Sequence, residues 1–96
     1  MAKLTDDEVR DGLSGLPGWE RQGDEIVKEY KFGGFGDAVA FVVRIGFRAE
    51  KADHHPDMDI RYNKVRVALS THSEGGLTGK DLDLAAQVEA AAFVGA

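Results

Sequence analysis

The stretch DMDIRYNKVRVALST, residues 57–71, decides the fold, because apolar and polar side chains alternate along most of it. Alternation with a period of two places apolar residues on one face of a β-strand and polar residues on the other. Asn63 interrupts the pattern near its middle. The stretch therefore predicts two antiparallel strands, or one bent strand, with a core face formed by Val65, Val67 and Leu69.

A second pair of strands is expected upstream of this stretch. Residues 19–22 fit a short strand, Gly23 and Asp24 a turn, and residues 25–32 the partner strand. One face of the partner is apolar except for a lysine; it carries Ile26, Lys28, Tyr30 and Phe32. Trp19, the single tryptophan, is interpreted as a core residue packed under the sheet rather than as a ligand-stacking residue.

The first and second helices are expected on either side of this hairpin. Thr5 and Glu8 form a capping box, so a helix is predicted from about residue 6 to residue 14. The second helix is predicted over residues 38–52, with Asp37 as its N-cap. Its apolar arc is wide, which predicts burial on more than one side, and Gly46 is expected to allow close packing.

A third helix closes the chain. Thr78 is its expected cap, and its alanine-rich apolar face could pack on the sheet or on another chain. The expected order is αββαββα. The predicted fold class is therefore α+β: a single-domain sandwich whose four-stranded antiparallel sheet carries its helices on one face.

Composition narrows the function classes. Ninety-six residues fit one domain, so we expect a single domain over residues 1–96. The net charge of −5 argues against a nucleic-acid surface, and no apolar run approaches the ~20 residues that a membrane span needs. The N-terminus lacks the apolar region of a secretory signal, and the chain has no cysteine. We therefore expect a cytoplasmic protein without thiolate metal sites.

The three histidines of the chain gather in one window, at His54, His55 and His72. Imidazole has the side-chain pKa nearest neutrality, so this grouping indicates an acid–base pocket. Pro56 pushes His55 toward extended backbone, in which successive side chains diverge. One of the paired histidines is then expected to reach the reacting centre, while the other binds ligand or braces the pocket. The carboxylates expected to orient imidazoles are Glu50, Asp53 and Asp81.

Other interpretations of these residues stay open on the pattern alone. Each histidine could be structural or simply exposed. Zinc is disfavoured, because the histidines lack the spacing of a helical HExxH site and no cysteine is present. Asp81, three residues after Thr78, could be only a capping residue near the positive end of a helix.

The polar residues also match a known pattern. Glu50-x3-His54-His55-Pro56-x5-Tyr62-x9-His72-x8-Asp81 resembles the signature of the pterin-4a-carbinolamine dehydratases. The similarity extends over nearly the whole chain, through residues 62–65, 70–72 and 76–81, Trp19, and the run containing Phe32, Phe35, Ala38 and Phe41.

This resemblance implies the αββαββα fold and the dehydration of a 4a-hydroxytetrahydropterin to a quinonoid dihydropterin, in tetrahydropterin recycling, without a metal or organic cofactor. It implies that His54 and His72 are the acid and base, and that Asp81 orients a histidine. His55 would bind substrate and share the proton transfer. The implied catalytic set is His54, His55, His72 and Asp81, and the implied pterin-binding set is Glu50, Asp53, His54, His55, Pro56, Thr71, His72, Ser73 and Glu74.

The resemblance also implies partners and alternatives. A homodimer or homotetramer is expected, with an aromatic amino acid hydroxylase in the same pathway. Members of the family also act without catalysis, as a dimerisation cofactor of a transcription factor or as a Rubisco assembly factor. Met58 stands where many relatives carry tryptophan, which puts substrate contacts at that position in doubt.

Overall fold

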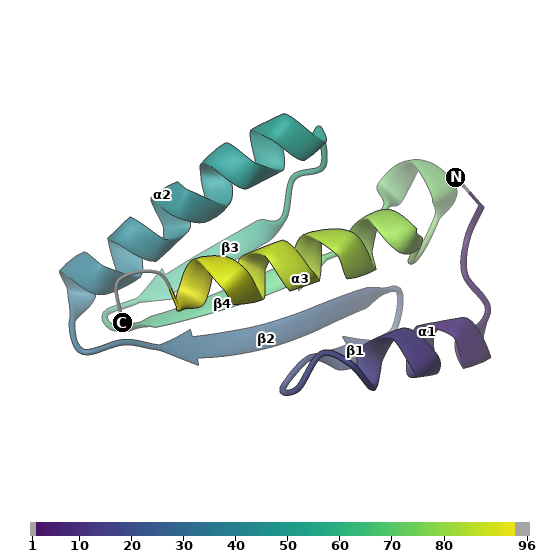
Figure 1. The fold of residues 1–96 in the computed structure, drawn as a ribbon, viewed down its shortest axis with the longest axis horizontal. Coiled ribbons are helices and arrows are strands. Elements are labelled where there is room, and N and C mark those ends of the chain that lie inside the picture. The colour runs from purple at the N-terminus through teal and green to yellow at the C-terminus, as the bar shows by residue number, and fades with distance from the viewer. Residues whose placement is uncertain (1, 94–96) are drawn as a thin grey trace.

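The computed structural model describes residues 2–93, and within them the expected element order is confirmed (Figure 1). A 3-10 turn, η1, is inserted between the last strand and the last helix. In chain order the elements are α1 (Asp6–Leu13), β1 (Glu20–Gln22), β2 (Glu25–Lys31), α2 (Phe35–Ala52), β3 (Asp57–Arg61), β4 (Lys64–Leu69), η1 (His72–Glu74) and α3 (Gly79–Ala92).

The four strands form one antiparallel sheet in the order β1-β2-β4-β3. The stretch at residues 57–71 forms two strands rather than one bent strand, because Tyr62 and Asn63 make the connection. Tyr62 has a left-handed backbone, with φ of 53°. Asn63 makes two hydrogen bonds to Phe32: its carbonyl accepts from the Phe32 N–H at 2.8 Å, and its Nδ2 donates to the Phe32 carbonyl at 2.9 Å. This contact ties the β3–β4 turn to the end of β2.

The core lies between the sheet and its helices. Figure 1 shows α2 and α3 lying across the same face of the sheet, in front of β3 and β4, as the sequence predicts. The core-facing residues recur with a period of two along β2 and β4, but Val27 and Ala68, which pair with each other on the opposite face, are buried as well. The core cluster comprises Val9, Leu16, Trp19, Ile26, Tyr30, Ala38, Phe41, Ile45, Ala49, Val65, Val67, Leu69, Leu77, Leu84, Ala85, Val88 and Ala91.

The predicted capping box of α1 and the predicted Thr78 cap of α3 are both present, and the latter is also a capping box. In α1, the Thr5 hydroxyl accepts from the backbone N–H of Glu8, whose carboxylate accepts from the N–H of Thr5. Gly12 of α1 packs closely on α3, because a Cβ there would lie 2.4 Å from the Leu82 side chain. The first helix is therefore fixed at its start by hydrogen bonds and along its length by close packing.

The predictions for α2 are wrong in three respects. The helix begins at Phe35 after an extended Gly34, so Asp37 lies in its first turn and is not the N-cap. Nothing lies within 4 Å of a Cβ built on Gly46, so that glycine does not allow close packing. The helix is buried on one side only, because a single sheet and one neighbouring helix cover it, and an apolar stripe stays exposed. We call Phe35, Val39, Val43 and Phe47 the α2 stripe.

The inward-facing Lys28 is accommodated by a polar cluster, which we call the Glu89 cluster. Lys28 Nζ lies 2.5 Å from Glu89 Oε1, Trp19 Nε1 donates to the same oxygen at 3.1 Å, and the Tyr30 hydroxyl also donates to it. Trp19 is buried, as predicted, with its indole N–H satisfied. No described helix has the length and apolar character needed to cross a membrane.

Candidate active site

His54 is placed by the way α2 ends. Asp53 caps the helix in a left-handed conformation, with φ of 51°, and the backbone N–H of His54 still donates to Ala49 at 3.2 Å. This turn directs the His54 side chain inward, where it is 10% exposed. Its Nε2 lies 2.6 Å from Asp81 Oδ1, so the C-terminal end of α2 meets the N-terminal end of α3 through this pair.

Asp81 is fully buried and divides its two carboxylate oxygens between two tasks. Oδ1 faces His54. Oδ2 accepts from the backbone N–H of Thr78 at 2.9 Å, which completes the capping box of α3, and from the Thr71 hydroxyl at 2.8 Å. The two interpretations left open for Asp81 therefore both describe contacts that it makes: it is a capping residue and also a histidine partner.

These contacts fix the direction of each hydrogen bond. Thr71 gives its proton to Asp81, so the Thr78 hydroxyl donates to Thr71 Oγ1, 2.9 Å away. A carboxylate only accepts, so the proton between His54 and Asp81 lies on Nε2 of the imidazole. Nδ1 is then the His54 nitrogen at which a proton can be gained or lost.

His55 contacts a different carboxylate from His54, which confirms the prediction that the two side chains do not point at the same atom. Its Nε2 lies 2.7 Å from Glu50 Oε1, and both side chains are largely exposed. The expected carboxylate partners are thus confirmed for Asp81 and Glu50. The carboxylate of Asp53 accepts no hydrogen bond within residues 2–93; the contribution of this residue to the pair is its backbone turn.

A cavity of about 250 Å³ lies where α2, β4, η1 and α3 meet, and we call it the histidine cavity. It brings together most of the expected site, including all three histidines. Ser70 and Lys80 join it although they were not among the expected site residues, whereas Glu50, Pro56, Glu74 and Asp81 do not line it. The lining residues are Asp53, His54, His55, Ser70, Thr71, His72, Ser73 and Lys80.

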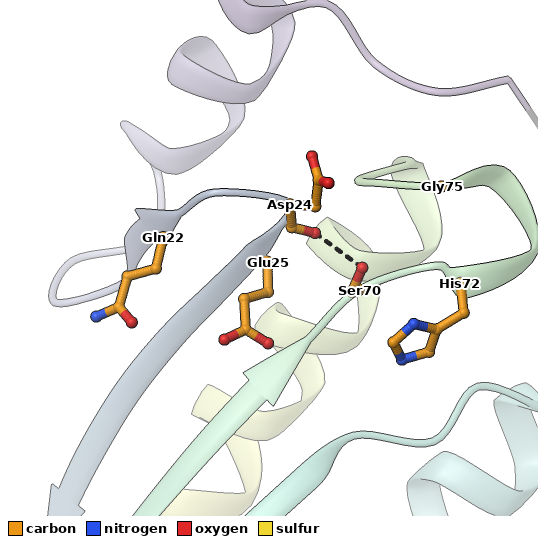
Figure 2. A pocket seen from close by; sticks show the side chains of 6 residues that line it. All are labelled: Gln22, Asp24, Glu25, Ser70, His72 and Gly75. Carbon is orange, nitrogen blue, oxygen red and sulfur yellow. Dashed lines mark hydrogen bonds between the residues drawn. The ribbon is translucent and has the colours of Figure 1, made fainter.

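A second cavity of about 350 Å³ adjoins the first, and we call it the outer cavity (Figure 2). Ser70 and His72 line both cavities, so they form the boundary between them. This cavity was not predicted, because its lining comes from β1, the β1–β2 turn, β2 and the segment after β4, which only the folded sheet brings together. It is lined by Gln22, Asp24, Glu25, Ser70, His72 and Gly75.

Met58 lines neither cavity. It is partly buried on the helix-covered face of β3, where it packs against the core. Among residues 2–93, no three histidine, cysteine, aspartate or glutamate side chains come together in a way that could hold a metal ion. The arrangement instead offers one largely buried imidazole–carboxylate pair, two exposed imidazoles and hydrogen-bonding groups around one cavity.

Comparison with known proteins places this geometry in a family. Residues 2–91 match the family model described as pterin 4 alpha carbinolamine dehydratase. A protein of Roseiflexus castenholzii is 56% identical over 92% of this chain and 95% of its own length. One of Mycobacteroides abscessus is 52% identical over 93% and 95%. Both bear the name "Putative pterin-4-alpha-carbinolamine dehydratase".

Two solved structures share the fold. A "transcriptional coactivator/pterin dehydratase" from Brucella melitensis superposes with a TM-score of 0.90 and 38% identity, covering 94% of this chain and 98% of its own. A pterin dehydratase-like protein described as a RuBisCO assembly factor of the α-carboxysome superposes with a TM-score of 0.69. Its identity is 24%, and the match covers 79% of this chain and 90% of its own.

Proposed function

The chain belongs to the pterin-4α-carbinolamine dehydratase family, and we propose that it removes water from a 4a-hydroxytetrahydropterin to give a quinonoid dihydropterin. The observation that carries this proposal is the buried His54–Asp81 pair on a cavity that also contains His72. Two imidazoles beside one cavity suit a reaction that needs one proton given and one proton taken.

The reaction balances without oxidant, reductant or cofactor. The C4a–O bond breaks as the hydroxyl receives a proton and departs as water. The proton on N5 passes to a base, and its bonding electrons form the N5–C4a double bond. We assign the two transfers to His54 and His72, with Nδ1 as the working nitrogen of His54. Asp81 is a positioning residue that holds the His54 ring and its tautomer.

The remaining expected residues are proposed to hold the pterin. Thr71, Ser73, His55 and Asp53 support this role by lining the histidine cavity. Pro56 and Glu74 flank lining residues in the chain, and Glu50 acts through His55, which it contacts. A planar ring placed between the histidines would meet polar groups on several edges.

The test is turnover of the 4a-carbinolamine by the purified protein. We expect acceleration well above the spontaneous rate, and a loss of about 10²–10⁴-fold on His54→Gln or His72→Gln. Glutamine at position 54 keeps a donor for Asp81 but cannot exchange a proton, so the fold is preserved. Glu29→Gln, on the exposed part of β2, is the matched control. Wild-type protein that does not exceed the spontaneous rate would refute the proposal.

We also propose that the chain forms a homo-oligomer and works in the cytoplasm beside an aromatic amino acid hydroxylase that supplies its substrate. The α2 stripe supports self-association, since four exposed hydrophobic side chains on one helix are unusual for a monomer. Sedimentation equilibrium of the wild type and Val43→Asp measures this directly. A monomeric wild type would contradict self-association without touching the dehydratase proposal.

A binding or assembly role is the second candidate function. The same α2 stripe favours it, and the names of the two structural neighbours include coactivator and assembly roles. Capture of one protein at fixed stoichiometry, by a chain that does not turn over the carbinolamine, would establish this alternative. Turnover that depends on His54 and His72 would favour the enzyme.

A further inference from the structure

The outer cavity adjoins the proposed reaction site. His72 and Ser70 each line both cavities, so a ligand touching His72 in the histidine cavity lies next to the outer one. Figure 2 shows the side chains of Glu25 and His72 on either side of the chain end of β4, where Ser70 lies. Any substituent close to the reacting atoms therefore has this space within reach.

Sheet register explains why these groups form one row. Ile26 pairs with Leu69, so continuing one residue places Glu25 beside Ser70. Gln22 pairs with Glu25 in the neighbouring strand pair. Side chains opposite one another in adjacent strands lie on the same face of a sheet. The row Gln22–Glu25–Ser70 therefore lies on the face of the sheet that the helices leave uncovered, and it leads toward His72.

The lining of the outer cavity is rich in hydrogen-bond acceptors. Glu25 Oε1 lies 3.7 Å from Arg66 Nη2, and the same Arg66 nitrogen donates to Gln22 Oε1 at 3.1 Å. Glu25 Oε2 has no hydrogen-bond partner among residues 2–93. The Ser70 hydroxyl donates to the backbone carbonyl of Asp24 at 2.8 Å, so its remaining capacity is as an acceptor. Such a lining suits a ligand that donates several hydrogen bonds.

The chemistry of the substrate indicates which part enters. In a 4a-hydroxytetrahydropterin the reacting atoms are C4a and N5, and N5 is bonded to C6, which carries the side chain. The first atom of a side chain on C6 thus lies two bonds away from N5, an atom at which the proposed acid and base act. Hydroxyl groups on that chain are donors, which a carboxylate accepts.

We propose that the outer cavity is a side-chain subsite in which Glu25 accepts hydrogen bonds from a polyhydroxylated alkyl chain on C6 of the pterin. This rests on the proposed dehydratase function and adds a specificity-determining residue to it. The chain then prefers pterins with dihydroxypropyl or trihydroxypropyl side chains over pterins with a methyl group at C6. Gln22 supports Glu25 by sharing Arg66 with it.

The experiment compares two substrates on the wild type and on two variants. kcat/KM is measured for 4a-hydroxytetrahydropterins that carry at C6 either a dihydroxypropyl or a methyl group. The enzymes are the wild type, Glu25→Ala and Glu29→Ala. Glu29 is the matched control, because it lies on the same face of β2 and lines neither cavity. Removing one charged acceptor is expected to cost about tenfold in kcat/KM.

The expected result is a loss of about tenfold for Glu25→Ala with the dihydroxypropyl substrate, carried by KM, and no change with the methyl substrate. Glu29→Ala leaves both unchanged. Equal losses on both substrates, or no loss on either, would overturn the subsite. A wild type that handles both substrates equally well would also overturn it while leaving the dehydratase proposal intact. Failure of the dehydratase proposal is distinct: neither substrate is then turned over.

Discussion

Helix α3 carries two carboxylates about two turns apart that do different work, Asp81 near its start and Glu89 near its end. Asp81 is fully buried, caps the helix and holds an imidazole that lines a cavity. Glu89 accepts from Lys28, Tyr30 and Trp19, and it lines none of the described cavities that contain a histidine. Multiple hydrogen bonds to a carboxylate therefore do not by themselves indicate a reactive site.

The difference lies in what each partner can do. Tyr30, one partner of Glu89, stays protonated over the physiological range. Burial and the hydrogen bond to Glu89 raise the pKa of Tyr30 far above its ordinary value. Burial alone would raise the pKa of Glu89, but hydrogen bonds from Lys28 and Tyr30 outweigh it and leave the pKa below its ordinary value. The Glu89 cluster is thus a structural ion pair and hydrogen-bond group, whereas His54 is held by Asp81 and lines a cavity.

The largest expected effect is that of Asp81→Asn. An amide that accepts from the Thr78 N–H presents its NH₂ group to His54, which forces the imidazole into the other tautomer. We expect a loss of kcat of at least about 10²-fold together with an altered pH profile. Turnover rates across pH measure both, and circular dichroism checks the fold. A variant with wild-type kcat would remove Asp81 from the proposed positioning role.

Glu89→Gln should lower stability but leave activity nearly unchanged, in contrast to Asp81→Asn. We expect kcat to stay near the wild-type value, while the free energy of unfolding falls by about 1–3 kcal/mol because Lys28 loses its anionic partner. Urea denaturation and turnover assays on the same preparation measure the two quantities. A large loss of kcat with unchanged stability would reverse the distinction between the two carboxylates.

The stability difference between wild type and Glu89→Gln should also depend on pH in a defined direction. The folded-state pKa of Glu89 is depressed, so its contribution is complete above the unfolded pKa of about 4.3 and is lost as pH falls through the lower folded value. The two unfolding curves should therefore converge in acid. Curves that stay equally separated in acid would show that the lost stability does not come from the charge of Glu89.

Thr71→Val removes one hydrogen bond to Asp81 and leaves the charge of Asp81 unchanged. Valine matches the shape of threonine but gives Asp81 Oδ2 no proton and leaves the Thr78 hydroxyl without its acceptor. We expect about 1–2 kcal/mol of lost stability and a fall in kcat of only a few fold. Thermal unfolding and turnover measure these effects. A loss as large as that of Asp81→Asn would mean that Thr71 is itself needed for the reaction.

Gly46→Ala, in neither carboxylate region, gives the smallest effect. It lies inside α2 with open space where a Cβ would project. Replacing a helical glycine with alanine should raise stability by up to about 1 kcal/mol without changing kcat. Thermal unfolding provides the measurement. Destabilisation would show that a partner packs against α2 at this position in solution, which the α2 stripe also suggests.

Local sequence patterns correctly predicted those helices and strands whose position depends on residues near one another in the chain. Alternation around Val65 and Val67 gave β4, and the Thr5 and Thr78 boxes gave the starts of α1 and α3. Pro56 correctly indicated that His54 and His55 diverge. The start and burial of α2 were misjudged, because apolar residues predict a buried face whether or not this chain supplies the surface that covers it.

The candidate site was predictable in its histidines but not in its surroundings. His54 and Asp81 could be recognised from their residue types and spacing in the sequence. The hydrogen bonds of Thr71 and Thr78 could not, because they depend on three-dimensional packing. Glu25 and Gln22 reach the outer cavity only through strand pairing, which brings residues far apart in sequence together. Likewise, Lys28 looked like a break in an apolar face until Glu89 supplied its partner.

Because Asp81 both caps α3 and holds the His54 ring, opening of the first turn of α3 should interrupt the proposed reaction. Whenever that turn frays, the Thr78 amide is released and the His54 ring loses its anchor at the same time. Helix ends open far more often than whole domains unfold. The hydrogen-exchange rate of the Thr78 amide should therefore report the fraction of molecules in which His54 is not held in position for proton transfer. On heating, the turnover rate should stop rising at a temperature below the one at which the sheet unfolds.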